Sequence, residues 1–232
     1  MEANTGNQSE EVAVVTGGNR GIGLQICKQL ASNGVTVVLT ARDGKRGGEA
    51  VSIILDTLGL SNVVFHQLDV SDPSSAVRLA EFIKQKSIMQ QLLGRQLTSA
   101  TEKLSGERLV NQQELNNIDN LSEERLDELS ELFLKDFKDG ELERHGWPTE
   151  GGFIAYKVSK AIMNAYSRIL AKEHPSLCIN CVHPGFVQTD MSFQVGDLTV
   201  EEGARGALMM ALAPKGGMTG GFLNCTEVAP FV

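Results

Sequence analysis

The stretch Thr16-Gly17-Gly18-Asn19-Arg20-Gly21-Ile22-Gly23 joins an apolar strand, predicted for Val12–Thr16, to a helix predicted to begin at Ile22. Glycines in this stretch permit a tight turn and a close approach of the helix to the strand. The N-terminus of such a helix offers free N–H groups and the positive end of its dipole to an anion. The stretch therefore predicts a binding site for nucleotide phosphates at the end of the first strand.

Strands and helices alternate through the first third of the chain. The predicted strands are Val12–Thr16, Val35–Thr40 and Val63–Leu68, and the predicted helices are Ile22–Ser32, Gly47–Leu58 and a helix that Asp72 and Pro73 open and that runs to about Lys86. The second strand is almost wholly apolar, as expected of a parallel strand covered on both faces. This order predicts an α/β fold, with a Rossmann-like, doubly wound parallel sheet in three layers.

The alternation breaks after Lys86. The segment from 87 to 104 is polar and rich in glutamine, and its only candidate strand is the weakly patterned stretch Arg95–Thr98. A further strand–helix–strand unit would need on the order of thirty residues or more. We therefore expect a sheet that lacks one central strand.

The second half of the chain returns to α/β patterning after a long acidic helical segment, 105–147. The expected elements are a helix capped by Ser122, helices over Phe153–His174 and Val200–Leu212, and strands over Leu177–Val182 and Gly220–Cys225. Leu126, Leu129, Phe133 and Phe137 repeat at helical spacing in the acidic segment, which indicates a packing stripe. We expect residues 1–232 to form one domain, with 105–147 as a helical insertion.

Charge and hydropathy exclude several classes of partner. The net charge is -8, and residues 107–144 hold 12 acidic and 5 basic side chains, which argues against nucleic acid or an anionic membrane as partner. No apolar run approaches the roughly eighteen residues of a membrane span. The N-terminal residues are polar and form no apolar signal region. We expect a cytoplasmic protein that is a monomer.

Cys178 and Cys181 form a C-x-x-C pattern. Because they fall in a predicted strand, residues three apart point to opposite faces, which disfavours a redox pair. A zinc site would also need a second pair of ligands. We expect buried, reduced thiols and no metal site.

Tyr156 and Lys160 lie four residues apart on a predicted helix and so share one face. An isolated tyrosine has a pKa near 10 and is a poor acid or base at neutral pH. A lysine ammonium beside it favours the phenolate and lowers that pKa. The pair is therefore a candidate for proton transfer, although a surface lysine on an amphipathic helix gives the same pattern.

Three motifs together resemble the short-chain dehydrogenase/reductase family. They are the glycine turn with its particular spacing, the run Tyr156-Lys157-Val158-Ser159-Lys160, and the loop His183-Pro184-Gly185-Phe186-Val187-Gln188-Thr189-Asp190 after a late strand. The resemblance implies that Tyr156 exchanges a proton with the substrate oxygen. It also implies that Lys160 tunes Tyr156 and holds the nicotinamide ribose.

The same resemblance implies the remaining site residues. Implied cofactor contacts are Gly17, Asn19, Arg20, Gly21, Ile22 and Gly23 in the turn, Asp69 and Val70 at the adenine, and Tyr156, Lys160, Pro184, Gly185, Val187 and Thr189 toward the nicotinamide. Ser99 is the nearest match to the serine that holds the substrate carbonyl, although Glu102 stands where the family has glycine. The family's Asn on its fourth helix has no counterpart.

In a fold of this kind, the residue at the end of the second strand determines whether NAD or NADP is bound. A carboxylate there would bind the ribose hydroxyl of NAD, whereas this chain has Thr40-Ala41-Arg42. Two guanidinium groups, those of Arg20 and Arg42, can clamp a 2′-phosphate, which indicates NADP(H). The alternative is that Arg42 is an exposed loop charge.

The acidic segment ending in His145-Gly146-Trp147-Pro148, followed by the tyrosine motif, resembles plant menthone/neomenthol and salutaridine reductases and their carbonyl reductase relatives. The resemblance covers 11–86 and about 105–232. It implies NADPH-dependent reduction of a ketone or aldehyde on a terpenoid- or alkaloid-like molecule, or the reverse oxidation of an alcohol. The alternative is a truncated, catalytically impaired relative that binds nucleotide or a protein partner. A methyltransferase is disfavoured by Arg42 and by the Tyr–Lys pair.

Overall fold

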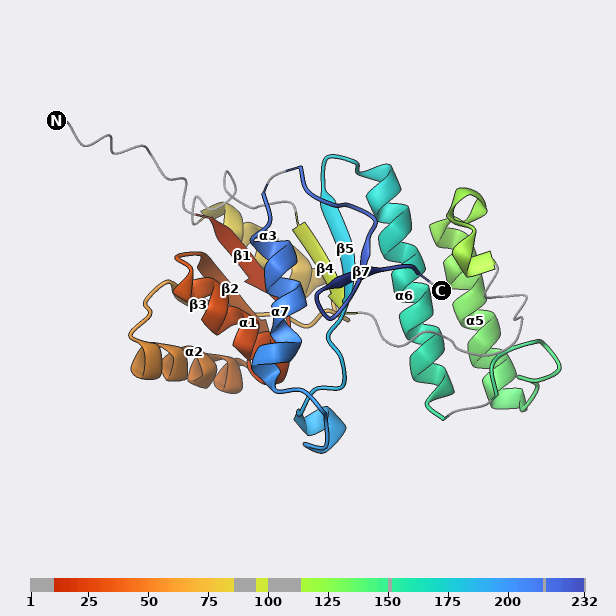
Figure 1. Cartoon of the computed structure of the whole chain (residues 1–232), viewed down its shortest axis with the longest axis horizontal. Coiled ribbons are helices and arrows are strands. Elements are labelled where there is room, and N and C mark those ends of the chain that lie inside the picture. Colours follow the sequence, from red (N-terminus) through yellow and green to blue (C-terminus); the bar gives the residue numbers. More distant parts are fainter. Residues whose placement is uncertain (1–10, 86–94, 100–113, 150–151, 215, 232) are drawn as a thin grey trace. The chain divides into compact units, whose positions relative to one another are not determined.

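The computed structural model describes residues 11–85, 114–149, 152–214 and 216–231, and the backbone of 95–99 (Figure 1). The chain divides into two compact units. Met1–Leu93 and Phe186–Ala204 make up the first unit, and Gly94–Gly185 and Arg205–Val232 make up the second. Each unit has a sheet of its own, so the two are described in turn.

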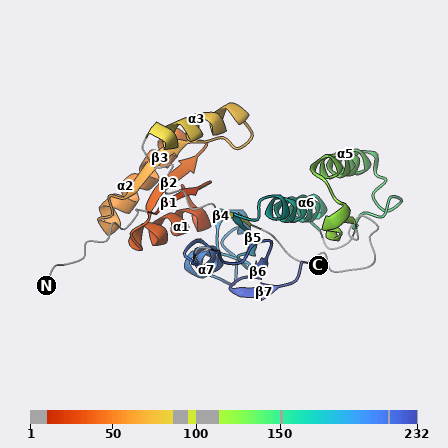
Figure 2. The ribbon, with the colours of Figure 1, turned by 90° about the horizontal axis from the view of Figure 1, so that it is seen from above.

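The first unit holds a parallel three-stranded sheet in the order β1-β2-β3. Its strands are β1 (Val12–Val15), β2 (Thr36–Ala41) and β3 (Val63–Gln67), and its helices are α1 (Gly21–Ser32), α2 (Gly44–Leu58) and α3 (Pro73–Gln85). Val12 lies opposite Thr36, and Val37 lies opposite Val63. Figure 2 shows α1 and α3 on opposite sides of this sheet. Val38 packs with Leu79 of α3, whereas its neighbour Leu39 lies beside the glycine turn, as the alternation of a strand requires.

Capping residues set the helix boundaries of the first unit. Asp72 accepts a hydrogen bond from the backbone N–H of Ser74 at 2.9 Å, so α3 begins where the sequence predicts. α2 begins three residues earlier than predicted, because the carboxylate of Asp43 accepts the N–H of Arg46 at 3.0 Å. Gly59 ends α2 in the left-handed conformation, with φ 65°.

The glycine turn brings α1 into close contact with the end of β1. Gly17 has φ 64° and Gly21 has φ 52°, a region that favours glycine. A Cβ atom added at Gly23 would collide with the carbonyl oxygen of Gly17. The helix can therefore start this close to the strand only when position 23 carries no side chain.

The second unit holds a four-stranded sheet in the order β4-β5-β6-β7. Its strands are β4 (Arg95–Ser99), β5 (Cys178–His183), β6 (Phe222–Asn224) and β7 (Glu227–Ala229), of which only β7 runs antiparallel to its neighbour. The predicted strand Arg95–Thr98 thus forms and pairs with β5. β7 is not predicted from the sequence, because the turn before it places Cys225 at φ 56° without a glycine to signal it.

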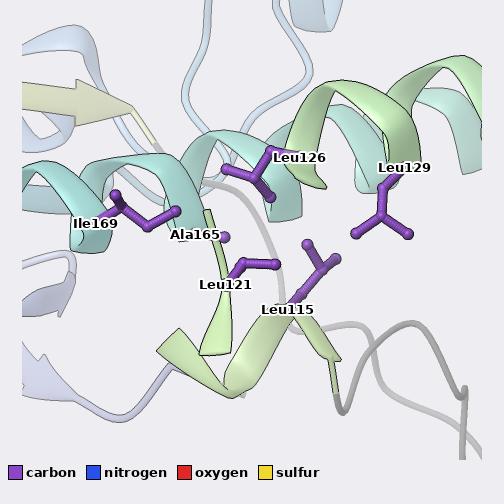
Figure 3. Close-up of a cluster of buried hydrophobic side chains, with 6 residues drawn as sticks. All are labelled: Leu115, Leu121, Leu126, Leu129, Ala165 and Ile169. Atoms are coloured by element: carbon purple, nitrogen blue, oxygen red, sulfur yellow. The ribbon is translucent and has the colours of Figure 1, made fainter. Parts of the chain in front are cut away.

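Two long helices accompany the second sheet. α6 (Ile154–Glu173) packs against β4 and β5, and α5 (Glu123–Asp139) packs along α6 after the short helix η2 (Ile118–Asn120). Ser122 caps α5, as predicted, by accepting the N–H of Arg125 at 3.2 Å. Figure 3 shows the apolar cluster between the helices, made of Leu115, Leu121, Leu126, Leu129, Ala165 and Ile169. Phe137, the last residue of the predicted stripe, is half exposed.

The fold class predicted from the sequence is confirmed as α/β with parallel strands and covering helices. The chain leaves β5 through η3 (Asp190–Ser192) and α7 (Val200–Ala211) before it reaches β6. β1 and β4 each lie at the edge of their own sheet. No helix within the described ranges is long and apolar enough to cross a bilayer.

The edge position of β1 predicts a marginally stable protein. Among the described residues, no strand of its sheet pairs with the outer edge of β1, which carries backbone N–H and C=O groups. We expect a thermal unfolding midpoint below ~60 °C, measured by calorimetry. A single sharp transition at or above that temperature would contradict the expectation.

The contact at Gly23 predicts a strong effect of one methyl group. We expect Gly23→Ala to lower the thermal midpoint by about 5 °C or more, because the new Cβ forces α1 away from β1. Gly48→Ala is the control, since a Cβ at Gly48 in α2 meets nothing within 4 Å. That variant should be neutral or slightly stabilising. Equal midpoints for the two variants would refute this account of the turn.

Candidate functional site

The N-terminus of α1 is open to an anion. Arg20 is the N-cap residue in an extended conformation, and within the described part of the chain no side chain caps the helix. The first turn also carries no acidic residue. Its backbone N–H groups thus keep the capacity to bind a phosphate, which agrees with the prediction for this turn.

The loop after β5 returns to the glycine turn. Thr189 lies beside Gly21, since a Cβ on Gly21 would be 3.5 Å from the Thr189 methyl group. Arg20 Nη1 lies 3.5 Å from Asp190 Oδ2, and both side chains are largely exposed. The structure therefore brings two motifs together that lie far apart in the sequence.

Ser192 holds this loop in shape. Its hydroxyl donates to the carbonyl of Val187 at 2.6 Å and accepts the N–H of Thr189 at 2.9 Å. The side chain of Val187 is buried, close to the position that a Cβ on Gly203 would take. Val187 thus anchors the loop, and Thr189 is presented at the turn.

Arg42, Asp69 and Val70 follow the carboxyl ends of β2 and β3. Arg42 is exposed, and its carbonyl accepts the side-chain amide of Gln67 at 2.8 Å. Hydrogen bonds from the hydroxyl and the N–H of Ser71 hold the pKa of Asp69 below its usual value, and the charge of Arg42 adds to the effect. Val70 is 77 % exposed. These residues lie at the same sheet edge as the glycine turn, as parallel strands require.

Two carboxylates near Arg42 and Arg20 have roles in the structure that the sequence patterns do not predict. Asp43 follows Arg42 directly but serves as the cap of α2. Asp190 pairs with Arg20, one of the two guanidiniums predicted for a 2′-phosphate. Asp43 could have been recognised from its place before a helix, whereas no spacing rule connects positions 20 and 190.

Tyr156 and Lys160 meet on the N-terminal half of α6, in the second unit. Lys160 Nζ lies 5.6 Å from the centroid of the Tyr156 ring. Tyr156 is 41 % exposed. Partial burial lowers the pKa of the Lys160 ammonium. The helix thus places a phenol within reach of solvent or a ligand, with a cation beside its ring.

The other predicted residues of the second unit lie at the carboxyl end of its sheet. The backbone of Ser99 pairs in register with Val182, and β5 then leads through Pro184 to Gly185, which has φ 83°. A short connection joins the C-terminus of α6 to the start of β5, so the helix end that bears Tyr156 lies toward the same edge. The side chain of Ser99 and residues 100–113 lie outside the described residues.

None of the four cysteines is part of a disulfide. Cys181 is fully buried, as expected, but Cys178 is only half-buried, with its thiol 3.7 Å from the carbonyl oxygen of Gly217. The expectation of a buried thiol is therefore wrong for Cys178, because residues three apart on a strand point to opposite faces and only one of the two faces is fully covered here. In the ranges that the structure describes, no group of three or more His, Cys, Asp or Glu side chains is arranged for a metal ion.

Comparison with known proteins agrees with this geometry. The short chain dehydrogenase family model matches residues 11–93, ending within the segment where the predicted alternation breaks. Short-chain dehydrogenase/reductase 1 of Saponaria officinalis is 35% identical, over 99% of this chain and 99% of the relative. The (+)-neomenthol dehydrogenase of Arabidopsis thaliana is 36% identical, over 89% of this chain and 93% of the relative.

The fold comparison gives the same family. The structure of salutaridine reductase from Papaver somniferum superposes with a TM-score of 0.82 at 33% identity, covering 93% of this chain and 99% of that one. The alignment with the Saponaria protein spans 303 residues, at least 71 more than the 232 of this chain, as a missing internal segment requires. The chain belongs to the short-chain dehydrogenase/reductase family, and its relatives include a plant salutaridine reductase and a plant (+)-neomenthol dehydrogenase.

Proposed function

We propose that this protein uses NADPH to reduce a ketone or aldehyde on a terpenoid- or alkaloid-like small molecule, or catalyses the reverse oxidation. The observation that carries the proposal is the Tyr156–Lys160 pair on α6, in a chain that also has an uncapped, glycine-lined helix N-terminus. The substrate class follows from the relatives, whose names include salutaridine reductase and neomenthol dehydrogenase.

The residues of the first unit suit a nucleotide with a 2′-phosphate. The N–H groups of α1 would hold the pyrophosphate, and the absence of a side chain at Gly21 and Gly23 lets it approach the backbone. Arg42 is exposed beside the adenine-side residue Asp69 and would bind the 2′-phosphate. Arg20 would join it after leaving Asp190, at small cost, because an exposed ion pair contributes little.

Bound NADPH supplies the hydride that reduces the carbonyl carbon. The Tyr156 hydroxyl donates its proton to the carbonyl oxygen, and the Lys160 ammonium stabilises the phenolate that remains. Ser99 would hold the carbonyl oxygen by a hydrogen bond. In the oxidative direction Tyr156 receives the proton from the alcohol.

A second candidate is a catalytically impaired relative that binds nucleotide or a protein partner without turnover. The length of the alignment favours it, since at least 71 aligned positions have no residue in this chain. The two candidates differ in one measurement, which is the consumption of NADPH in the presence of a panel of cyclic ketones. NADPH binding without consumption would favour the second.

Cofactor choice is tested at Arg42. We expect NADPH to bind more tightly than NADH, and Arg42→Ala to weaken NADPH binding about tenfold or more while NADH binding stays unchanged. The control is Arg78→Ala, which removes an exposed arginine paired with Asp72 on α3. Calorimetric titration of both cofactors measures the effect. Equal affinities of the wild type for NADPH and NADH would refute the assignment.

The proton donor is tested at Tyr156. We expect Tyr156→Phe to lose nearly all ketone reduction and to bind NADPH as the wild type does, because only the hydroxyl is removed. Tyr166→Phe is a matched control, since Tyr166 lies on the same helix and is 38 % exposed against 41 % for Tyr156. Substantial turnover by Tyr156→Phe would show that another group supplies the proton.

A further inference from the structure

One carboxylate of the acidic segment is turned inward. Asp136 lies in the last turn of α5 with its side chain 2 % exposed, whereas the other acidic residues of α5 are exposed. Its Oδ2 accepts the indole N–H of Trp147 at 2.8 Å, and its Oδ1 lies 2.8 Å from His145 Nδ1. Both partners come from the His145-Gly146-Trp147-Pro148 run, so the carboxylate fastens that run to the end of α5.

The hydrogen bonds decide the charge state of Asp136. Burial alone would raise the pKa of this carboxyl, but the bonds from Trp147 and His145 outweigh it and hold the pKa below its usual value. The group is therefore ionised at neutral pH. Removing this carboxylate would leave the buried indole N–H without its acceptor. A buried donor without an acceptor lowers stability more than the replacement of both partners by apolar groups.

Trp147 connects this carboxylate to α6. The indole is 4 % exposed and meets the Phe133 ring edge-on, with centroids 5.1 Å apart. Both rings pack with Val158, which is buried and stands between Tyr156 and Lys160 in the sequence of α6. Ile154 and Ile162, one turn to either side of Val158, pack on the same cluster.

Within the described residues, the N-terminal end of α6 is not held by a capping side chain. Phe153 is the N-cap residue, with φ 51°. An uncapped helix end frays unless packing fixes it. The C-terminal half of α6 is held by another cluster, the leucine cluster around Ala165 and Ile169 (Figure 3). The two clusters meet at Ile162, which packs against both.

We infer that Asp136 is a positioning residue, which fixes Trp147 against Val158 and thereby sets the N-terminal half of α6 that carries Tyr156 and Lys160. The catalytic consequence rests on the proposed function, whereas the mechanical one does not. A small shift of reacting groups lowers turnover strongly, so the inference predicts a kinetic effect from a residue outside the reaction.

The test compares Asp136→Ala with Asp136→Asn, which keeps an oxygen to accept the indole N–H, and with Asp139→Ala on the exposed face of α5 as control. Hydrogen exchange read by mass spectrometry should quicken about tenfold or more over 154–162 in Asp136→Ala, and less than about twofold over 165–173. The asparagine and control variants should exchange as the wild type does. Trp147 is the only tryptophan of the sequence, so a red shift of its emission in Asp136→Ala reports its release directly.

Kinetics give the second readout. We expect Asp136→Ala to lower kcat about tenfold or more with an unchanged Kd for NADPH, and Asp136→Asn to restore kcat. Equal exchange in Asp136→Ala and the control, or equal quickening of both halves of α6, would overturn the inference. If Asp136→Ala does not fold, Trp147→Phe is used in its place, because it keeps an aromatic ring and removes the N–H that Asp136 accepts. Its exchange over 154–162 is then compared with that over 165–173 in the same way. A wild type without turnover would defeat the proposed function, and the exchange pattern would still decide the role of Asp136.

Discussion

The close approach of α1 to the end of β1 is the constraint on which the first unit depends. The N–H of Gly18 donates to the carbonyl of Thr40 at 2.9 Å, and the Thr40 hydroxyl donates to the carbonyl of Val15 at 3.1 Å. A Cβ at Gly18 would press on Leu39 and Cys27, just as one at Gly23 would strike the turn itself. The glycines are therefore required by packing in the first place. The open N–H groups that suit a phosphate follow from the same geometry, because the chain enters the helix without a capping side chain.

Elements with a strong local signal could be predicted from the sequence. α3 begins at the Asp72-Pro73 pair, and Ser122 caps α5, because a cap acts on N–H groups two or three residues away. α2 begins earlier than predicted because Asp43 caps it, and the glycines at 44, 47 and 48 weaken the helical pattern at its start. β7 was missed because its turn uses Cys225 in a conformation that sequence rules assign to glycine or asparagine.

In the candidate site too, the contacts between residues close in sequence could be predicted, and those between distant segments could not. Lys160 lies four residues from Tyr156, so helix periodicity alone predicted the contact that the structure measures. The pairing of Arg20 with Asp190 and of Asp136 with Trp147 depends on how distant segments pack, and no periodicity expresses that. In the acidic segment the composition even misleads, because a run of surface carboxylates gives no sign that one of them is buried.

We expect the missing segment to affect the stability of the protein more directly than the local geometry of the candidate site. The glycine turn is built from β1, α1 and the loop around Thr189, all within the first unit. The Tyr156–Lys160 pair is built on α6 and braced by α5 and Trp147, all within the second. Each arrangement rests on contacts inside its own unit. Among the residues that the structure describes, the outer edges of β1 and β4 have no partner strand within their own sheets, and cross-strand pairing is where a sheet gains its cohesion. We therefore expect the free energy of unfolding, and not the identity of the site residues, to limit any activity that the protein has.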